Sequence, residues 1–425
     1  MTVRGTAGRG GRSAAAPRVG LFGGLGSGNI GNDASMESIL GYIKAEHPGA
    51  IVDAMVTGPG QLRDRYGIEA VPLQWYQSYE QRTSGVTAIV LKVLSRGIDA
   101  FRTASWVRRH EVVIVPGMGV LEASLPLRPW QFPYNLFVLC LSGRVFGTKV
   151  ALVSVGARVV NQRLTRWLYR SAARLACYRS YRDTRSRDAM RRPRRRTAPD
   201  PVYPDLVFGM PMPEFGPGDA KTVGVGVMAY YGTNDDDRGQ ADQIHRSYLA
   251  KMTSFTGWLV DQGYQVRLLV GDANGSDDGV VRDIQAGLRA RRPDLDPAQV
   301  IAEPVATFAD LARAMAPASA VVATRYHNIV CALQLCRPTI SIGYAAKNLA
   351  LMTDMGLAEY CQSVNSLDVA MLIEQFNRLQ GESAELRQRL MVRNAVTGRL
   401  AQDQFEELSA ALFPAAGPRR TPAVT

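Results

Sequence analysis

The stretch VVATRYHNIVCALQLCRPTISIGYAAKNLALMTDMG, residues 321–356, decides the fold that we expect for this chain. A short run rich in β-branched residues, 320–324, leads into the polar turn 325–327, and an apolar helix is predicted over 328–335. A second apolar strand is predicted over 338–343. Strand, turn, helix and strand form a βαβ unit, whose two strands are parallel and whose turn lies at the carboxyl end of the first strand. Ligands of open α/β sheets bind at that edge, so the stretch predicts both a parallel sheet and the place of a site.

The side chains at this edge favour a small anion as the ligand. Arg325 can bind a carboxylate or a phosphate through two parallel hydrogen bonds, and the helix start near Asn328 attracts negative charge. Tyr344 and Lys347 follow the second strand and add another cation. A ligand that carries both a carboxylate and a phosphate would suit these groups.

A glycine-rich turn near the start of the chain supplies a second candidate site. A strand over 18–23 is followed by GLGSGNIGND, 24–33, and a helix is expected over 34–46. Glycines in such a turn let a ligand approach the backbone closely. Asn29 and Asp33 either hold a sugar hydroxyl at the mouth of the strand, or only shape the turn and cap the helix.

The same turn contains the spacing G-x-G-x-x-G over residues 26–31, with Asp53 on the next strand, which is also typical of dinucleotide-binding proteins. An NAD-linked enzyme is the less favoured interpretation. Asn32 and Asp33, both good N-cap residues, follow the last glycine and place the predicted helix start after the pattern. Asp53 also lies in the middle of its predicted strand rather than at the end.

Charge is concentrated in one segment of the chain. The net charge is +12, and residues 158–196 hold 14 Arg, 2 Asp and no Lys or Glu, so the rest of the chain is about neutral. A nucleic-acid-binding function would depend on this segment alone, and we expect no nucleic-acid partner. Arg163, Arg166, Arg170 and Arg174 share one face of a predicted helix. That face is either a solvated surface or a site of peripheral contact with anionic lipid through residues 163–196.

The sequence predicts neither a membrane span nor an export signal. The longest apolar region, 132–141, is too short to cross a bilayer, and the first 17 residues lack an apolar core. We expect a cytoplasmic protein, with contact to the inner face of the membrane left open. Two Asp-containing loops, 234–238 and 271–279, lack partner ligands or the last Glu of a calcium loop, so no metal is expected.

Two motifs at opposite ends of the chain together resemble the polysaccharide pyruvyl transferase family. The C-terminal one is RYHNIVCAL, RPTISIGYAAK and LMTDMGL, and the N-terminal one is G-x-x-G-x-x-N-x-G-[DN]-D from Gly23 to Asp33. The R-D-x-x-S element at 182–186 and YPDLVF at 203–208, expected to be a strand, are similar to further elements of the family. Where the family usually has a run of glycines, this chain has Gly117-Met118-Gly119. The resemblance extends from Arg18 to about Cys361.

The resemblance implies two Rossmann-like domains that face a cleft, the GT-B arrangement of an α/β fold. We predict an acceptor-side domain over 18–208, a Pro- and Gly-rich linker over 209–218, and a donor-side domain over 219–380. The remaining predicted segments are a disordered tail at 1–17, a helix packing back toward the first domain at 381–413, and a tail at 414–425. Residues 66–109 are expected to be helical in part.

The resemblance also implies an enzyme that moves a pyruvyl group from phosphoenolpyruvate onto two sugar hydroxyls, forming a ketal and releasing phosphate. His327 would be the general acid that protonates the enol carbon, or alternatively a satisfied core histidine. Asp33 would act as base or orient the acceptor hydroxyl. The donor is assigned to Arg325, Asn328, Tyr344 and Lys347. The acceptor, a glycan or lipid-linked saccharide, is assigned to Gly28, Asn29, Gly31, Gly117 and Gly119. No metal or organic cofactor is implied.

Three other classes of function stay open at this point. One is a GT-B glycosyltransferase that uses a nucleotide sugar, and the second is the NAD-linked enzyme. The third is a non-catalytic protein that binds glycans or lipid phosphates through its Arg face. A nucleotide-sugar enzyme should offer a carboxylate to the ribose near the second strand, but after Tyr344 the sequence offers only Lys347 and Asn348.

Overall fold

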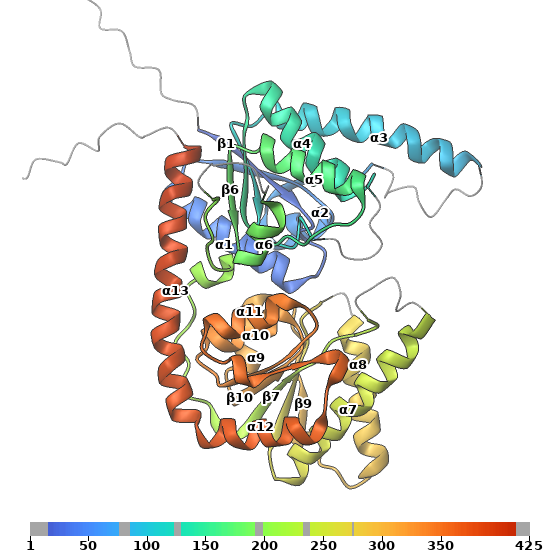
Figure 1. Ribbon diagram of the computed structural model, residues 1–425, viewed down its shortest axis with the longest axis vertical. Coiled ribbons are helices and arrows are strands. Elements are labelled where there is room, and N and C mark those ends of the chain that lie inside the picture. Colours follow the sequence, from blue (N-terminus) through green and yellow to red (C-terminus); the bar gives the residue numbers. More distant parts are fainter. Residues whose placement is uncertain are drawn as a thin grey trace, which may run out of the picture.

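The computed structural model describes residues 16–75, 86–122, 129–191, 199–232, 239–273 and 276–413, with only the backbone described at 86–93. The tail predicted at 414–425 and most of the one at 1–17 lie outside the described residues. Two parallel sheets, each flanked by helices, are stacked along the long axis of the molecule (Figure 1).

The first sheet has the strand order β3-β2-β1-β4-β5-β6. Its strands are β1 Arg18–Gly23, β2 Ile51–Val56, β3 Glu69–Pro72, β4 Val112–Pro116, β5 Lys149–Val155 and β6 Tyr178–Tyr181. The helices that accompany it are α1 Ile30–Glu46, α2 Pro59–Tyr66, α3 Val86–Val107, α4 Phe132–Phe146, α5 Arg163–Leu175 and α6 Thr184–Met190. Every residue of β4 is buried, because helices cover both faces of the sheet.

The second sheet has the strand order β12-β11-β10-β7-β8-β9. Its strands are β7 Asp219–Gly226, β8 Gln265–Leu269, β9 Val300–Ala302, β10 Ala318–Ala323, β11 Thr339–Gly343 and β12 Cys361–Ser363. Its helices are α7 Ala241–Asp261, α8 Ser276–Arg291, α9 Phe308–Met315, α10 Tyr326–Gln334, α11 Ala346–Asp354 and α12 Val369–Gly381. The expected βαβ unit is present, since β10 and β11 pair in parallel with Val321 opposite Thr339.

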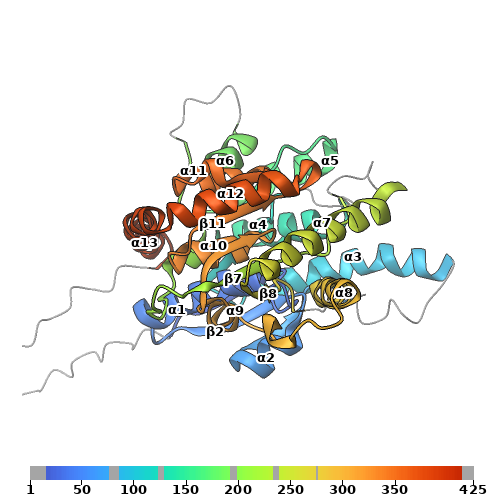
Figure 2. The same cartoon turned by 90° about the horizontal axis from the view of Figure 1, so that it is seen from below.

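The last helix, α13 Ser383–Leu412, contacts both sheets' domains. It runs along one edge of both domains in Figure 1 and is seen end-on in Figure 2. Asn394 Nδ2 donates to the carbonyl of Leu333 in the second domain (2.7 Å). Further along the helix, the buried amide of Gln404 donates to the hydroxyls of Ser154 and Ser180 in the first domain (2.9 and 2.8 Å). One helix therefore fastens the two domains through side-chain hydrogen bonds to each of them.

The start of α1 differs from the prediction, which placed it after Gly31. The helix begins at Ile30, and Asn29 is its N-cap, with the side chain oxygen accepting from the Asn32 N–H (3.2 Å). Asp33 instead accepts from the Gly26 N–H (2.7 Å) and so closes the preceding turn. Because Asn29 caps the helix, rather than Asn32 or Asp33, Gly31 lies inside the helix. The argument against a dinucleotide site that relied on a late helix start was therefore wrong.

Three other predicted elements also differ. The helix after β10 begins at Tyr326, two residues early, and Arg325 is its N-cap residue, since nothing in Tyr326 or His327 opposes helical backbone. The region 66–109 contains β3, a four-residue edge strand too short to give a period. Residues 203–208 do not form a strand, because Asp205 caps a 3-10 turn, Leu206–Gly209, through the Val207 N–H (3.2 Å).

Candidate active site

A cavity of about 730 Å³ lies between the carboxyl edges of the two sheets. Its polar and aromatic lining includes Glu122, Arg158, Asp183 and Arg185 from the first domain and Tyr230, Tyr231, Arg325, Tyr344 and Lys347 from the second. Among the described lining residues, the four cations outnumber the two carboxylates. Ligands of open α/β sheets bind at this edge, where strand ends present side chains from many segments at once. The cavity is therefore the candidate binding site, and it favours an anion.

Arg325 enters the cavity from the N-cap of α10, held by a carboxylate. Its Nε and Nη2 atoms donate to the two oxygens of Asp277 (2.9 and 2.7 Å), whose side chain is fully buried at the start of α8. Burial alone would lower the pKa of Arg325, but Asp277 raises it above its ordinary value. The pair of parallel hydrogen bonds that Arg325 was expected to donate to a ligand is thus donated to Asp277 within the protein. Nη1 is left without a partner among the described residues, and it is the edge of Arg325 that a ligand can bind.

Glu122 connects cations from both domains. Its Oε1 pairs with Nη2 of Arg182, and its Oε2 lies 3.6 Å from Nζ of Lys347. Burial would raise the pKa of Glu122, but Arg182, Lys347 and Arg158 together hold it below its ordinary value. Gly156 is required beside this pair, because a Cβ there would overlap the Arg182 guanidinium and the Glu122 carboxylate. Lys347 is thus tethered at the wall of the cavity.

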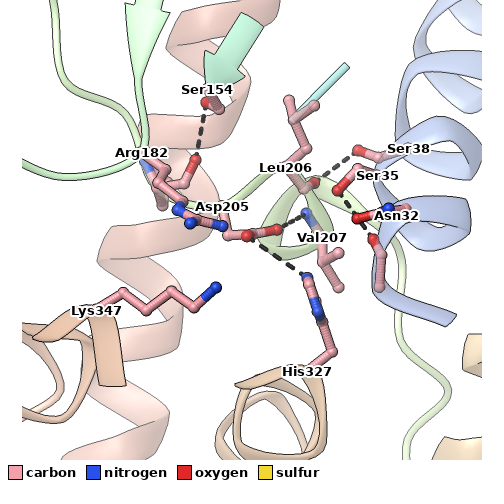
Figure 3. Close-up of polar contacts among 12 residues, drawn as sticks. Asn32, Ser35, Ser38, Ser154, Arg182, Asp205, Leu206, Val207, His327 and Lys347 are labelled. Atoms are coloured by element: carbon pink, nitrogen blue, oxygen red, sulfur yellow. Dashed lines mark hydrogen bonds and ion pairs between the residues drawn. The ribbon is translucent and has the colours of Figure 1, made fainter. Parts of the chain in front are cut away.

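His327 lies at the contact between the domains and is not among the residues that line the 730 Å³ cavity. Its ring packs directly on Gly31 of α1, where a Cβ would overlap the imidazole. Nε2 is 3.7 Å from Oδ2 of Asp205, which is an ion-pair distance and too long for a hydrogen bond. Figure 3 shows the ring directed at Asp205, with Arg182 beside that carboxylate. Although burial raises the pKa of Asp205, His327 and Arg182 lower it below its ordinary value.

A second cavity of about 410 Å³ lies on the other side of this ionic network. Arg182, Asp205, Tyr326 and Lys347 are among its lining residues, and Lys347 and Asp183 line both cavities. The Lys347 ammonium also lies 5.3 Å from the centre of the Tyr326 ring. Asp205, the partner of His327, therefore lines the 410 Å³ cavity, whereas Arg325 lines the 730 Å³ cavity. Lys347 lines both.

The residues of the glycine-rich turn contact the second domain directly. The Gly28 carbonyl accepts from the Ala273 N–H (2.7 Å), and Asn29 forms an isolated bridge with Asp272. Asp33 is buried behind them, and burial raises its pKa from 3.8 to about 6. None of Gly28, Asn29, Gly31 or Asp33 lines the 730 Å³ cavity. The turn forms part of the domain contact in this arrangement.

The other predicted donor and acceptor residues fall into two groups. Tyr344 and Lys347 line the cavity. Asn328 does not, because its side chain is fully buried and its Nδ2 donates to the Leu269 carbonyl (3.4 Å). Gly117 has a left-handed φ of 50°, and so does Met118 at 61°, a conformation that a non-glycine residue rarely adopts. Gly119 lies against the carboxylate of Glu122, so this turn positions Glu122 rather than lining the cavity itself.

The side chains expected of an NAD site are engaged elsewhere. Oδ1 of Asp53 accepts from the Trp106 indole (2.8 Å) and lies 2.8 Å from Nε2 of His110. Gly31 makes room for His327 of the other domain rather than for its own strand. The dinucleotide interpretation thus loses the carboxylate that would bind the ribose.

Sequence reasoning missed three carboxylates of the site. Asp277 was visible only as one of several acids in a loop, and its partner Arg325 is 48 positions away. Asp205 stands in the YPDLVF element, whose acid had no assigned role. Glu122 had no signal, because it follows β4 in an ordinary loop and meets Lys347 only through the tertiary fold.

The described part of the chain contains neither a cluster of metal ligands nor a helix that could span a membrane. No group of three or more His, Cys, Asp and Glu side chains is placed there to hold a metal ion. Within the same residues no helix has the length and apolar character needed to cross a bilayer. The loop at 234–238 lies outside the described residues, whereas Asp272 and Asp277 both serve Arg325.

Solved structures with similar folds include a UDP-GlcNAc 2-epimerase, a glycosyltransferase and a protein in complex with UDP. UDP-GlcNAc 2-epimerase from Neisseria meningitidis, bound to UDP-GlcNAc, has a TM-score of 0.55 and 10% identity, covering 92% of this chain and 99% of that one. The glycosyltransferase SnogD from Streptomyces nogalater has a TM-score of 0.51 and 15% identity, covering 93% and 99%. TcCGT1 in complex with UDP has a TM-score of 0.57 and 11% identity, covering 93% and 100%. At these identities the likeness shows the fold, and it confirms the predicted GT-B-like arrangement.

A search of curated protein sequences found no match. The family model described as polysaccharide pyruvyl transferase matches residues 29–345, which include the second half of the glycine-rich turn from Asn29 onward, and Glu122, Arg182, Asp205 and the Arg325–His327 turn. That match spans most of the chain, and the chain therefore belongs to the polysaccharide pyruvyl transferase family.

Proposed function

We propose that this transferase takes the pyruvyl group of phosphoenolpyruvate and joins it to two hydroxyls of one sugar as a ketal, releasing phosphate. The observation that carries the proposal is the cation-lined cavity between the domains, together with the family of the chain. Phosphoenolpyruvate bears a carboxylate and a phosphate, and both need fixed positive partners. The cavity supplies four positive groups, which are the Nη1 edge of Arg325 and the side chains of Arg158, Arg185 and Lys347.

The chemistry needs one proton donor and charge stabilisation for the leaving phosphate. The first sugar hydroxyl adds to C2 of the enol while C3 takes a proton and becomes the methyl group. Loss of phosphate and attack by the second hydroxyl then close the ketal, and the second hydroxyl proton leaves with phosphate. Lys347 lines both cavities, and we propose that its ammonium group stabilises the negative charge of the departing phosphate.

His327 is the proposed proton donor, and Asp205 would stabilise its protonated ring. In the present arrangement Gly31 covers the imidazole, so the transfer step requires the two domains to separate at this contact. Domain motions of this kind commonly admit substrate in transferases with two lobes. Asp33 lies at the same domain contact, and its pKa is raised to about 6. It is the proposed base that takes the proton of the acceptor hydroxyl.

The acceptor is proposed to lie against the tyrosines of the cavity. Tyr230 and Tyr231 follow β7, and Tyr344 follows β11, so three rings stand on the wall contributed by the second domain. Aromatic faces with a polar edge suit a sugar, which has apolar and hydroxylated surfaces. A nucleotide sugar is less well served, because the described residues that the second domain contributes to that wall include no carboxylate to bind a ribose.

Calorimetry with phosphoenolpyruvate, a UDP-sugar and NAD as separate titrants tests the donor. We expect binding of phosphoenolpyruvate only, weakened at least about tenfold by Arg325→Lys or Lys347→Gln. Lys at position 325 keeps a cation beside Asp277 but lacks Nη1. Arg289→Lys and Lys44→Gln, on exposed parts of α8 and α1, are the matched controls. Binding of the UDP-sugar or NAD in place of phosphoenolpyruvate would refute the proposal.

A further inference from the structure

The helical layer formed by α3, α4 and α5 exposes an unusual number of large apolar side chains. Helix α4 packs between α3 and α5, and Figure 1 shows the three together on one side of the first domain. Nine of the twenty large apolar side chains that are at least 36% exposed in the described residues belong to this layer or its adjoining turn. They are Leu94, Ile98, Phe101, Trp130, Leu141, Val145, Phe146, Leu164 and Trp167. Large apolar side chains gathered on the exposed faces of neighbouring helices indicate an interaction site.

These side chains lie on three neighbouring helices and the turn before α4, and they are hereafter called the apolar ridge of the α3–α5 face. Phe101 is 74% exposed and Trp167 is 53% exposed. The Trp167 ring packs on Phe137 of α4 (centroids 5.2 Å apart), and Trp130 packs on Tyr134 of the same helix (5.8 Å). Large aromatic rings presented to solvent on a helical surface are the usual anchors of proteins that lie in the bilayer interface.

The charge of this face is of one sign. Helices α4 and α5 contain five Arg and no Asp or Glu. The single acid of α3, Asp99, is buried and accepts from the Trp75 N–H (2.8 Å). A two-fold dimer through this face would set the Arg side chains of one copy against those of the other. An anionic surface instead complements them, at about 1 kcal/mol for each Arg near the headgroups.

We propose that the α3–α5 face docks on an anionic lipid bilayer, with its apolar ridge in the interface and its Arg side chains on the headgroups. The Arg helix foreseen from the sequence thus supplies only part of the surface, and the exposed aromatic residues supply the rest. The loop between β5 and α5 contributes Ala157, Arg158 and Val159 to the cavity wall. A docked bilayer would therefore lie near the cavity, a position that, if the proposed function holds, favours a lipid-linked saccharide as acceptor.

Flotation of the full chain with vesicles, without any substrate, tests the docking independently of the proposed function. Wild type is expected to float with phosphatidylcholine vesicles that contain phosphatidylglycerol, and at least about tenfold less with phosphatidylcholine alone. Phe101→Ser with Trp167→Ser, and separately Arg163→Glu with Arg170→Glu, should each lower the bound fraction at least about tenfold. The matched controls are Met391→Ser with Val392→Ser, equally exposed on α13, and Arg289→Glu with Arg291→Glu on α8, and both should float like wild type.

Equal flotation of the α3–α5 variants and wild type would overturn the proposal, as would failure of wild type to bind anionic vesicles. Light scattering tests the alternative, in which a second copy of the chain covers the α3–α5 face. A wild-type dimer that the Phe101 and Trp167 changes convert to a monomer, without vesicle binding, would assign the face to a second copy of the chain. Loss of flotation in both variant pairs, with circular dichroism melting unchanged, would establish the docking even if no pyruvyl transfer were found.

Discussion

At the scale of single residues, the site is a chain of alternating charges that crosses the domain boundary. His327, Asp205, Arg182, Glu122 and Lys347 follow one another, with the first and last from the second domain and the rest from the first. Each buried charge has an opposite partner, as buried ions require. The sequence allowed Lys347 and His327 to be predicted, because they follow strands in a recognisable motif, whereas Arg182 stood in the R-D-x-x-S element without an assigned role. The acids could not be paired with them, since each partnership depends on contacts between distant segments.

His327 is the residue whose replacement should affect the reaction most selectively. We expect His327→Gln to lower kcat for pyruvyl transfer by about a hundredfold or more, because a general acid typically contributes that much. His47→Gln, at the far end of α1, is the control and should keep wild-type kcat. Steady-state phosphate release measures both. Full activity in the His327 variant would show that the proton comes from another group.

Asp33 links stability to pH in a direction that can be tested. Burial raises its pKa from 3.8 to about 6, so the folded state binds the proton more tightly than the unfolded state. Stability should therefore fall as pH rises from about 4 to about 6, by up to about 3 kcal/mol, and stay lower above that range. Asp33→Asn keeps an acceptor for the Gly26 N–H and removes the charge.

We expect Asp33→Asn to raise the free energy of unfolding at pH 7.5 by up to about 3 kcal/mol, and to leave it nearly unchanged at pH 4. Urea denaturation at the two pH values measures the difference. The same variant should lose transfer activity if Asp33 is the base. An equal effect on stability at both pH values would contradict the assignment of a raised pKa.

At the scale of elements, the start of α1 is the most demanding position. Gly31 lies in the first turn of the helix with the imidazole of His327 on it, so Gly31→Ala forces a methyl group into the domain contact. We expect a loss of about 1–3 kcal/mol in unfolding free energy, as for other overpacked sites. Gly41→Ala on the same helix meets no atom within 4 Å and should stabilise by about 0.5–1 kcal/mol. Thermal unfolding of the two variants compares them, and a stable, active Gly31→Ala protein would show that the contact opens freely.

Element types were easier to predict from sequence than their ends. β1 and β11 lie where the apolar runs predicted them to within one residue, because a largely buried strand leaves an almost unbroken apolar stretch. The starts of α1 and α10 were misplaced by a few residues, since several adjacent polar residues could each cap a helix and only the tertiary contacts decide among them. The short edge strand β3 gave too few residues for any period to show.

At the scale of the whole molecule, α13 determines whether the two domains unfold together. Gln404 is buried between Ser154 and Ser180, so Gln404→Leu removes its hydrogen bonds to two buried hydroxyls and should cost about 1–3 kcal/mol. Gln402→Leu, exposed on the same helix, should change stability by less than about 0.5 kcal/mol. Denaturant unfolding followed by tryptophan fluorescence measures both. Equal stability of the two variants would show that α13 does not fasten the first domain.

Transfer of a pyruvyl group to a sugar can be observed in a single assay. Purified protein is incubated with phosphoenolpyruvate and a set of candidate glycans and lipid-linked saccharides, and the acceptors are weighed by mass spectrometry. We predict an acceptor that gains the mass of one pyruvate less one water, with one phosphate released for each product and with neither change in the Arg325→Lys variant. Transfer of a sugar from a nucleotide donor instead, with phosphoenolpyruvate left intact, would contradict the account.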